Sequence, residues 1–258
     1  MSIHPTALVD PSAELDSSVE IGPFCVIGPN VRIGAGTVVK SHVVINGHTV
    51  IGEQNEIYQF ASVGEANQDK KYRGEPTQLI IGDRNVIREN ATIHRGTVQD
   101  QGVTRIGNGN LFMASTHVGH DCVVGDNNIL ANYAALAGHV HVGDSVILGG
   151  YTGIHQFCQV ASFSMCGMGS MVTKDVPRYV MVSGNPAKAH GMNFEGMRRR
   201  GTPAEVIKAL RNAYKIIYVK GLPLEDALLE LERCAIFELE EVAAFVASIR
   251  SSIRGIVR

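Results

Sequence analysis

The chain has 258 residues, a hydrophobic content of 45% and a formal net charge of −2 at pH 7. This length allows one large domain or two small ones, with a real hydrophobic core. Its 23 basic and 25 acidic residues nearly balance, which excludes a global field that would draw the protein to nucleic acid or to an anionic membrane.

Cysteine usage and the lack of long apolar runs suggest the compartment. The five cysteines are odd in number, scattered and without a C-x-x-C pair, as expected of reduced thiols. No run approaches the roughly 18 apolar residues that a membrane span requires. The first residues do not resemble a secretory signal, because Ile3 already begins a repeat. We therefore expect a cytoplasmic protein without stable membrane insertion.

A six-residue repeat starts near the N-terminus. An aliphatic residue recurs at every sixth position from Ile3 to Val63, and the pattern resumes in the same phase at Ile81. A hydrophobic residue then recurs one residue later from Ile106 to Val172. A period of six fits neither an α-helix nor an alternating strand, and repeats of this kind form parallel β-solenoids.

Two polar insertions interrupt the repeat, at about residues 65–79 and 99–105. They predict loops that project from the solenoid, and such loops commonly decorate a binding face. The repeat therefore predicts a β-solenoid domain over residues 1–190.

The last part of the chain differs in kind. Residues 202–205 (Thr-Pro-Ala-Glu) match a helix start, with a capping Thr and a Glu placed to bond back. We expect a helix from there to about residue 220, ended by Gly221, and two further segments after Pro223 and over about 238–254. The prediction is an all-β solenoid with a C-terminal helical domain over residues 191–258, which would cover one open end.

The winding of the repeat predicts which polar side chains meet. Three hexads make one triangular coil, so residues 18 apart stack at about 4.8 Å along the axis. His120, Gly138 and Gln156 would form one column. Asp121 and His139 would form the next, with His117 close by, so polar groups converge on one edge.

The polar groups on this edge include those that a general-base acyl transfer requires. An imidazole such as His120 can take a proton near neutral pH, and the carboxylate of Asp121 can fix its tautomer. Gly138 offers a backbone N–H for an oxyanion with no side chain in the way. The chain has no G-x-S-x-G elbow and no obvious Cys nucleophile, so direct attack by a substrate hydroxyl is favoured over an acyl-enzyme.

Two other interpretations stay open at this point. Single histidines in such a repeat are often hydrogen-bonded corner residues, although several together weaken that explanation. His117, His120 and His139 could also form a three-histidine zinc site of the kind that hydrates carbon dioxide.

Longer motifs are more specific than the repeat. They are YQFASVGEANQDKKYRGEPT, TIHRGTVQ, HVGHDC, LAGHVHV, HQFC, GNPAKAHGMNFEGMRRRG and RNAYKIIY. Through these motifs the chain resembles, along nearly its whole length, the UDP-N-acetylglucosamine O-acyltransferases that begin lipid A synthesis.

The resemblance implies a fold, an assembly and a reaction. It implies a left-handed parallel β-helix and a homotrimer with active sites between subunits. The reaction would be transfer of an (R)-3-hydroxyacyl group from acyl carrier protein to the glucosamine 3-hydroxyl of UDP-N-acetylglucosamine. The phosphopantetheine-linked acyl carrier protein would be a co-substrate, with no bound cofactor and no metal.

The resemblance also implies residue roles. His120 would be the general base, Asp121 its orienting partner and Gly138 the oxyanion donor. The nucleotide sugar would lie against Asp69, Lys71, His117, His139, Gln156, Asn193, Glu195, Arg199 and Arg200. The last two would lie near phosphate, for which Arg is well suited; without the resemblance, a solvated loop and a surface charge run would explain the charged members.

Met168 is a candidate for substrate selection. By the resemblance, it stands where family members that use longer acyl chains carry glycine, and the 18-residue spacing would stack it on Gly150. Its side chain would close the acyl groove early and favour a medium chain such as 3-hydroxydecanoyl, although a flexible Met also simply fills gaps in packing.

Two other functions are compatible with the same fold. The sister N-acyltransferase of the pathway shares the repeat but typically carries an additional N-terminal domain, whereas here the repeats begin at once. A non-catalytic solenoid that binds sugar nucleotides or assembles partners would need no catalytic histidine.

Overall fold

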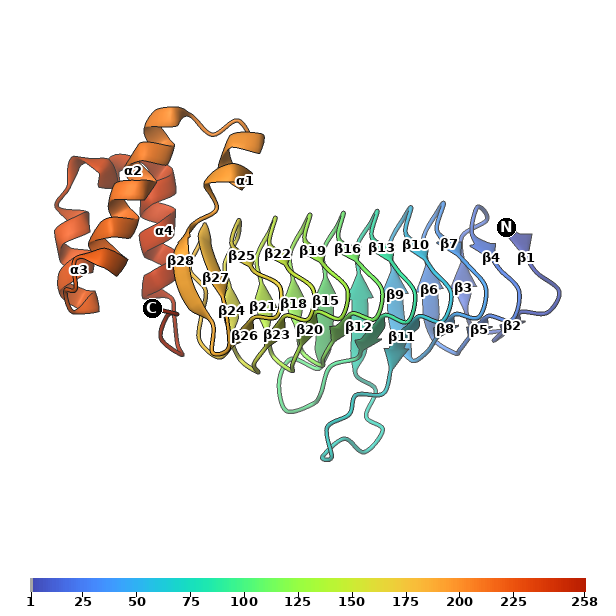
Figure 1. Cartoon of the computed structure of the whole chain (residues 1–258). Helices are drawn as coiled ribbons and strands as arrows, with labels where there is room; N and C mark the ends of the chain where they lie inside the picture. Colours follow the sequence, from blue (N-terminus) through green and yellow to red (C-terminus); the bar gives the residue numbers. More distant parts are fainter. Residues whose placement is uncertain (1) are drawn as a thin grey trace.

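The computed structural model describes residues 2–258 and confirms the predicted fold class, a left-handed parallel β-helix of hexapeptide repeats with C-terminal helices. Figure 1 shows a long solenoid with the helices packed at its C-terminal end. None of the described helices has the length and apolar character needed to cross a bilayer.

Three sheets form the faces of the solenoid, and the chain visits them in the order A, B, C. Sheet A contains β1 (Ser2–Ile3), β4 (Glu20–Ile21), β7 (Val38–Val39), β10 (Glu56–Ile57), β13 (Val86–Ile87), β16 (Leu111–Phe112), β19 (Ile129–Leu130), β22 (Ile147–Leu148), β25 (Met165–Cys166), β27 (Val180–Ser183) and β28 (Lys188–Met192). Sheet B contains β2 (Leu8–Val9), β5 (Val26–Ile27), β8 (Val44–Ile45), β11 (Ser62–Glu65), β14 (Thr92–His94), β17 (His117–Val118), β20 (Ala135–Leu136), β23 (Gly153–Ile154) and β26 (Met171–Val172). Sheet C contains β3 (Glu14–Leu15), β6 (Val31–Ile33), β9 (His48–Ile51), β12 (Gln78–Ile81), β15 (Val103–Ile106), β18 (Val123–Val124), β21 (His141–Val142) and β24 (Gln159–Val160).

The parallel register confirms the coil length. Strands β17, β20, β23 and β26 pair in steps of 18 residues, so that one outer row of sheet B reads His117, Ala135, Gly153 and Met171. Their neighbours along the chain, Val118, Leu136, Ile154 and Val172, fill the interior. Alternation within a strand therefore sends hexad residues inward and their neighbours outward.

The prism has three edges, named here by the sheets they join. The B–C edge contains residues 119–122, 137–140 and 155–158, and the A–B and C–A edges are named in the same way. Both insertions leave at the B–C edge, over residues 66–77 and 95–102. The second starts earlier than its sequence pattern suggested, because β14 ends at His94 and residues from Val103 onward already pair with β12.

The insertions do not disturb the stacking. His48 pairs with Gln78 across the first loop, and Thr92 pairs with His117 across the second. The extra residues are therefore extruded, and the coils on either side continue in register.

A ladder of buried asparagines holds the C–A edge. Asn85 Nδ2 donates to Asn55 Oδ1 at 3.0 Å, and Asn110 Nδ2 donates to Asn85 Oδ1 at 2.9 Å. Asn110 Oδ1 then accepts the Asn128 backbone N–H at 2.8 Å. Because each buried side-chain amide accepts a hydrogen bond from the next asparagine along the axis, the ladder favours one stacking register.

The C-terminal part contains four α-helices and two short helical turns. They are α1 (Phe194–Arg199), α2 (Ala204–Tyr214), the π-helical turn η1 (Lys215–Val219), α3 (Leu224–Glu232), the 3-10 turn η2 (Ala235–Glu238) and α4 (Glu240–Arg250). Buried Asp175 ties this part to the last coil, since its Oδ2 accepts the Ser252 hydroxyl at 2.7 Å and its Oδ1 accepts the Gln159 N–H at 2.8 Å.

The predicted helix start at residues 202–205 is correct in position and wrong in its cap. Helix α2 begins at Ala204 after Pro203, and no side chain caps it. The Thr202 N–H bonds to Met197 O, which closes the end of α1 instead.

Candidate active site

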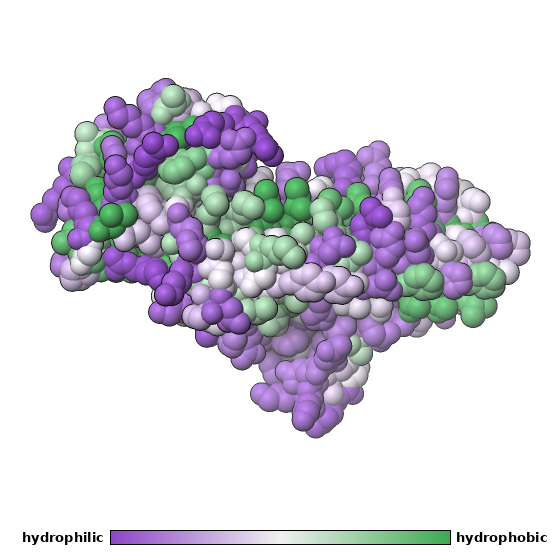
Figure 2. Space-filling model, viewed as in Figure 1, coloured by the Kyte–Doolittle hydropathy of each residue, from purple (hydrophilic) through white to green (hydrophobic). Residues whose placement is uncertain are grey.

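The predicted polar cluster lies on the B–C edge, beside both loops. Figure 1 shows both loops leaving the same side of the solenoid. In Figure 2 the projection on that side is mostly hydrophilic. Asp121, His139 and Phe157 occupy equivalent left-handed turn positions in three successive coils. The register therefore stacks these side chains along one edge, as the 18-residue spacing predicted.

His120 and Asp121 form a close pair. The His120 Nδ1 lies 2.9 Å from the Asp121 Oδ2. The Asp121 side chain is 1% exposed, whereas that of His120 is 19% exposed. The carboxylate is thus sealed beneath the edge, and the imidazole reaches the surface.

Asp121 is held as an anion by donors on several sides. Thr97 of the second loop donates its backbone N–H at 2.9 Å and its hydroxyl at 2.6 Å. Burial opposes ionisation of Asp121, but the hydrogen bonds from His120 and Thr97 and the charge of His139 outweigh it, so its pKa lies below the ordinary value.

The charge of Asp121 settles the tautomer of His120. An ionised carboxylate only accepts hydrogen bonds, so the proton between the two groups sits on His120 Nδ1. In the neutral ring, Nε2 is then left with a free lone pair.

Gly138 lies directly against the His120 ring. A Cβ added at Gly138 would come within 2.5 Å of His120 Cε1 and Nε2. Among the described residues 2–258, no acceptor bonds to the Gly138 N–H. Only glycine therefore leaves room for the ring here, and its amide is free to serve a ligand.

His139 belongs to a second histidine–carboxylate pair that sequence spacing did not reveal. Its Nδ1 lies 2.7 Å from Asp100 Oδ2 on the second loop, and its Nε2 lies 4.0 Å from Asp121 Oδ2. The ring stacks on Phe157 at 4.4 Å and meets the His120 ring edge to face at 4.9 Å.

Buried His94 and partly exposed His117 form a pair next to this cluster. His117 Nδ1 bonds to the Thr92 hydroxyl at 2.8 Å, and the two rings meet edge to face at 5.0 Å. Burial, followed by the charges of His117 and His120, lowers the pKa of His94 to about 4, and burial also lowers the pKa of His117. Sequence reasoning missed His94, whose one sequence signal was its place in the TIHRGTVQ motif.

A metal-binding arrangement of the predicted three histidines is not formed. Within residues 2–258, the group of side chains whose ligand atoms lie within 4.8 Å of one another is His120, Asp121 and His139, and it does not include His117. Asp121 in that group already accepts hydrogen bonds from Thr97 and His120.

The other predicted nucleotide-binding residues divide into two sets. Gln156 is exposed on the B–C edge, and the first loop carries Asp69 and Lys71, where the Lys71 N–H donates to Asp69 Oδ1 at 2.8 Å. These residues share the edge with His120.

The second set lies elsewhere on the chain. Asn193 caps α1 and donates to Phe163 O at the C–A edge, and Glu195 pairs with Arg199 at 3.1 Å. Arg200 packs over the Phe163 ring at 4.6 Å. Figure 1 shows α1 across the solenoid from the two loops, so one chain does not bring the two sets together.

An apolar groove of about 470 Å³ runs along sheet B beside the B–C edge. His117 lines one part of it, small Ala135 and Gly153 follow, and Met171 lies over Gly153. Met168 is outside this groove. It lies on the A–B edge with 75% of its surface exposed, in the register that stacks it on Gly150 as predicted.

The cysteines offer no nucleophile at this edge. The Cys122 thiol follows Asp121 but points inward, where it bonds to Ala137 O. Burial raises the pKa of Cys122 to about 12, so the thiol stays protonated.

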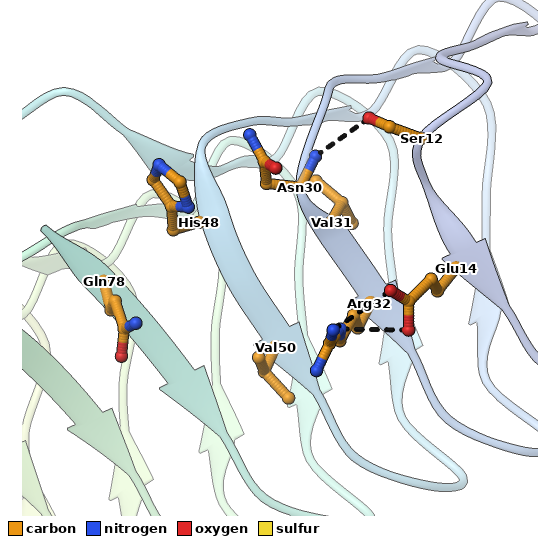
Figure 3. A pocket seen from close by; sticks show the side chains of 8 residues that line it. All are labelled: Ser12, Glu14, Asn30, Val31, Arg32, His48, Val50 and Gln78. Atoms are coloured by element: carbon orange, nitrogen blue, oxygen red, sulfur yellow. Dashed lines mark hydrogen bonds and ion pairs between the residues drawn. The ribbon is translucent and has the colours of Figure 1, made fainter. Parts of the chain in front are cut away.

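A separate hollow lies on sheet C near the N-terminal end (Figure 3). Arg32 on its floor is already paired with Glu14 at 3.0 Å, and Asn30 donates its N–H to Ser12. None of the predicted site residues lines it.

Known families match both parts of the chain. Residues 12–47 and 104–138 match the family "Bacterial transferase hexapeptide (six repeats)", and residues 175–257 match "Udp N-acetylglucosamine O-acyltransferase; Domain 2".

Individual relatives match over most of their length. The acyl-[acyl-carrier-protein]–UDP-N-acetylglucosamine O-acyltransferase of Stutzerimonas stutzeri is 61% identical over 208 residues, which cover 80% of each chain. The protein of that name from Pseudomonas aeruginosa is 59% identical over 79% of each chain. The crystal structure of UDP-N-acetylglucosamine O-acyltransferase from Moraxella catarrhalis is 55% identical, with a TM-score of 0.97 and 100% coverage of both chains.

The lowered pKa of His94 predicts acid destabilisation. Below pH 6.5 the unfolded chain protonates His94, while the folded protein resists until about pH 4, so stability falls as the pH falls. Between pH 7 and pH 5 we expect a loss of about 2 kcal/mol from this group. Thermal unfolding at both pH values should show a smaller loss for His94→Gln than for the parent. His141→Gln, at an exposed histidine, is the control. An equal loss of stability between pH 7 and pH 5 in all three proteins would refute the lowered pKa of His94.

Proposed function

This chain belongs to the family of acyl-[acyl-carrier-protein]–UDP-N-acetylglucosamine O-acyltransferases, and we propose that it moves an (R)-3-hydroxyacyl group from acyl carrier protein to the glucosamine 3-hydroxyl of UDP-N-acetylglucosamine. The reaction would open lipid A synthesis. The observation that carries the proposed mechanism is His120, bonded to ionised Asp121 and lying against the bare Gly138 amide.

His120 acts as the general base in this proposal. Its free Nε2 takes the proton of the sugar hydroxyl as the oxygen attacks the thioester carbonyl, and Asp121 stabilises the resulting imidazolium. The unbonded Gly138 N–H donates to the oxyanion of the tetrahedral intermediate. The C–S bond then breaks, and the thiolate of phosphopantetheine recovers the proton from His120.

Direct transfer without an acyl-enzyme is supported by the surrounding side chains. The thiol of Cys122 is buried with a raised pKa. His120 is the partly exposed ring beside a free amide, so an incoming hydroxyl is the nucleophile that it can activate.

The nucleotide sugar would be held by both sets of predicted residues. The set at or beside the B–C edge consists of Asp69, Lys71, His117, His139 and Gln156. The set at the C–A edge consists of Asn193, Glu195, Arg199 and Arg200. A single site can use both sets only if the second comes from another copy. This division supports sites between subunits, as in the homotrimer that the sequence resemblance implies.

The acyl chain would lie in the groove on sheet B, which starts at His117 and is floored by small residues. Strongly exposed Met168 lies across that sheet, and in an assembled trimer it would limit the chain to a medium length such as 3-hydroxydecanoyl. Its exposure leaves it free to meet a ligand or a second copy.

The general-base proposal is tested by His120→Ala. We expect turnover to fall by roughly 10² to 10⁴ with the fold intact, because general-base catalysis supplies about that factor. Turnover with UDP-N-acetylglucosamine and hydroxyacyl carrier proteins would be compared with that of His141→Ala, an exposed histidine on sheet C. Near-normal turnover of His120→Ala would remove this residue from the mechanism.

The ruler proposal is tested by Met168→Gly. We expect its donor preference to move toward longer acyl chains, because in the assembled trimer the Met168 side chain of another copy would no longer limit the space for the acyl chain. A panel of hydroxyacyl carrier proteins of different length measures this, with Met171→Ala as the comparison. An unchanged profile in Met168→Gly, or a shift in Met171→Ala alone, would contradict the role of Met168.

The assembly is tested by light scattering. A homotrimer has three times the 27.8 kDa mass of the chain. Tyr133 and Tyr151, stacked and half exposed on the same edge as Met168, are candidates for the contact. A monomeric mass in an active preparation would rule out a site shared between copies.

A further inference from the structure

The second loop approaches the B–C edge with a complementary set of groups. Thr97 donates to the carboxylate of Asp121, and Asp100 accepts from the imidazole of His139. A turn in which the Asp100 N–H bonds to Thr97 O at 3.4 Å separates these two contacts. The loop thereby contacts two adjacent coils. Thr97 is the donor to Asp121 in one coil, and Asp100 is the acceptor from His139 in the next.

We propose that Asp100 is a positioning residue that fixes the tautomer and orientation of His139 for binding of the nucleotide sugar. This inference rests on the proposed function of His139 as a sugar-nucleotide contact. With its Nδ1–H donated to Asp100 at 2.7 Å, the ring presents Nε2 toward the His120 and Asp121 side of the site.

Two further contacts make this orientation unique. The face of His139 stacks on Phe157, and its edge meets the His120 ring at 89°. A flipped ring would place a carbon beside the Asp100 carboxylate and lose the hydrogen bond. The groups that face His139 are Asp100, Asp121, His120 and Phe157, so Asp100 supplies the one short hydrogen bond to the ring.

The other anchors of the loop support a role for the pair beyond holding the loop in place. The His139 side chain is 14% exposed and that of Asp100 is 37% exposed. The loop is already held at Thr97 and by the Asn67 amide, which donates to Gly96 O at 2.9 Å. Removing Asp100 should therefore free the His139 ring more than it frees the loop.

The test compares Asp100→Ala, Asp100→Asn and the control Gln101→Ala, a change at the next exposed loop position. Nitrogen-15 NMR of the histidine rings reports which His139 nitrogen carries the proton, with His139→Gln identifying the signal. We expect Asp100→Ala to lose the Nδ1-protonated signature. Asp100→Asn should keep it, because the amide oxygen of Asn still accepts a hydrogen bond from the His139 Nδ1–H.

Kinetics give the second measurement. We expect Asp100→Ala to raise the KM for UDP-N-acetylglucosamine about tenfold with little change in kcat, since one charge-assisted hydrogen bond is worth roughly that much. Asp100→Asn should recover most of the affinity, and Gln101→Ala should resemble the parent.

The outcomes separate the two proposals. An unchanged ring signature in Asp100→Ala, or an unchanged KM, would overturn the role of Asp100. Loss of thermal stability in both Asp100 variants without a change in KM would also overturn it, in favour of a purely structural contact. A parent protein without acyl transfer would refute the proposed function, while the NMR measurement would still decide whether Asp100 sets the His139 tautomer.

Discussion

The parallel register between coils is the constraint on which the rest of the structure depends. Each outer residue meets its equivalent in the next coil, which is 18 positions later where no loop intervenes, at one strand spacing of about 4.8 Å along the axis. Side chains at a corner are consequently delivered in columns. The buried asparagine ladder of the C–A edge and the His139–Phe157 stack of the B–C edge are two products of the same rule. The asparagine ladder stabilises the register, and the register in turn places the His139 and Phe157 rings against each other.

This constraint makes the close approach at Gly138 possible. In a column, the residue below His120 necessarily points toward its ring, and any side chain there would collide with it. Glycine at this position both removes the clash and leaves a backbone amide in the gap. The geometry of the site therefore follows from the choice of one small residue in a fixed register, and no specialised loop conformation is needed to bring His120 and the amide together.

The repeat determined how far sequence reasoning could go. Inside the periodic part, spacing alone located His120 against Gly138 and placed Asp121 in the column beside it, because the 18-residue period fixes which residues stack. The Asp100–His139 and Thr97–Asp121 bonds were not predictable, since a loop without periodicity can reach many places. Helix α1 was also missed, because a helix of six residues that is held by packing carries little periodic signal of its own. His94 escaped attention because the second loop breaks the 18-residue count, so that β14 and β17 pair 25 positions apart.

The open side of the sheet B groove is the strongest physical argument for a second copy in the site. An acyl chain lying over Ala135 and Gly153 would touch one wall and leave much of its apolar surface in water. Ligand sites usually bury most of their ligand, and each buried methylene contributes about 0.8 kcal/mol. A second wall would therefore improve binding steadily along the chain. The exposed Met168 and the Tyr133–Tyr151 stack lie on another edge of the same molecule, where a copy related by rotation could present them to the groove. If that copy also carried Arg199 and Arg200 of α1 to the loop of Asp69, the two separated sets of residues would form one site.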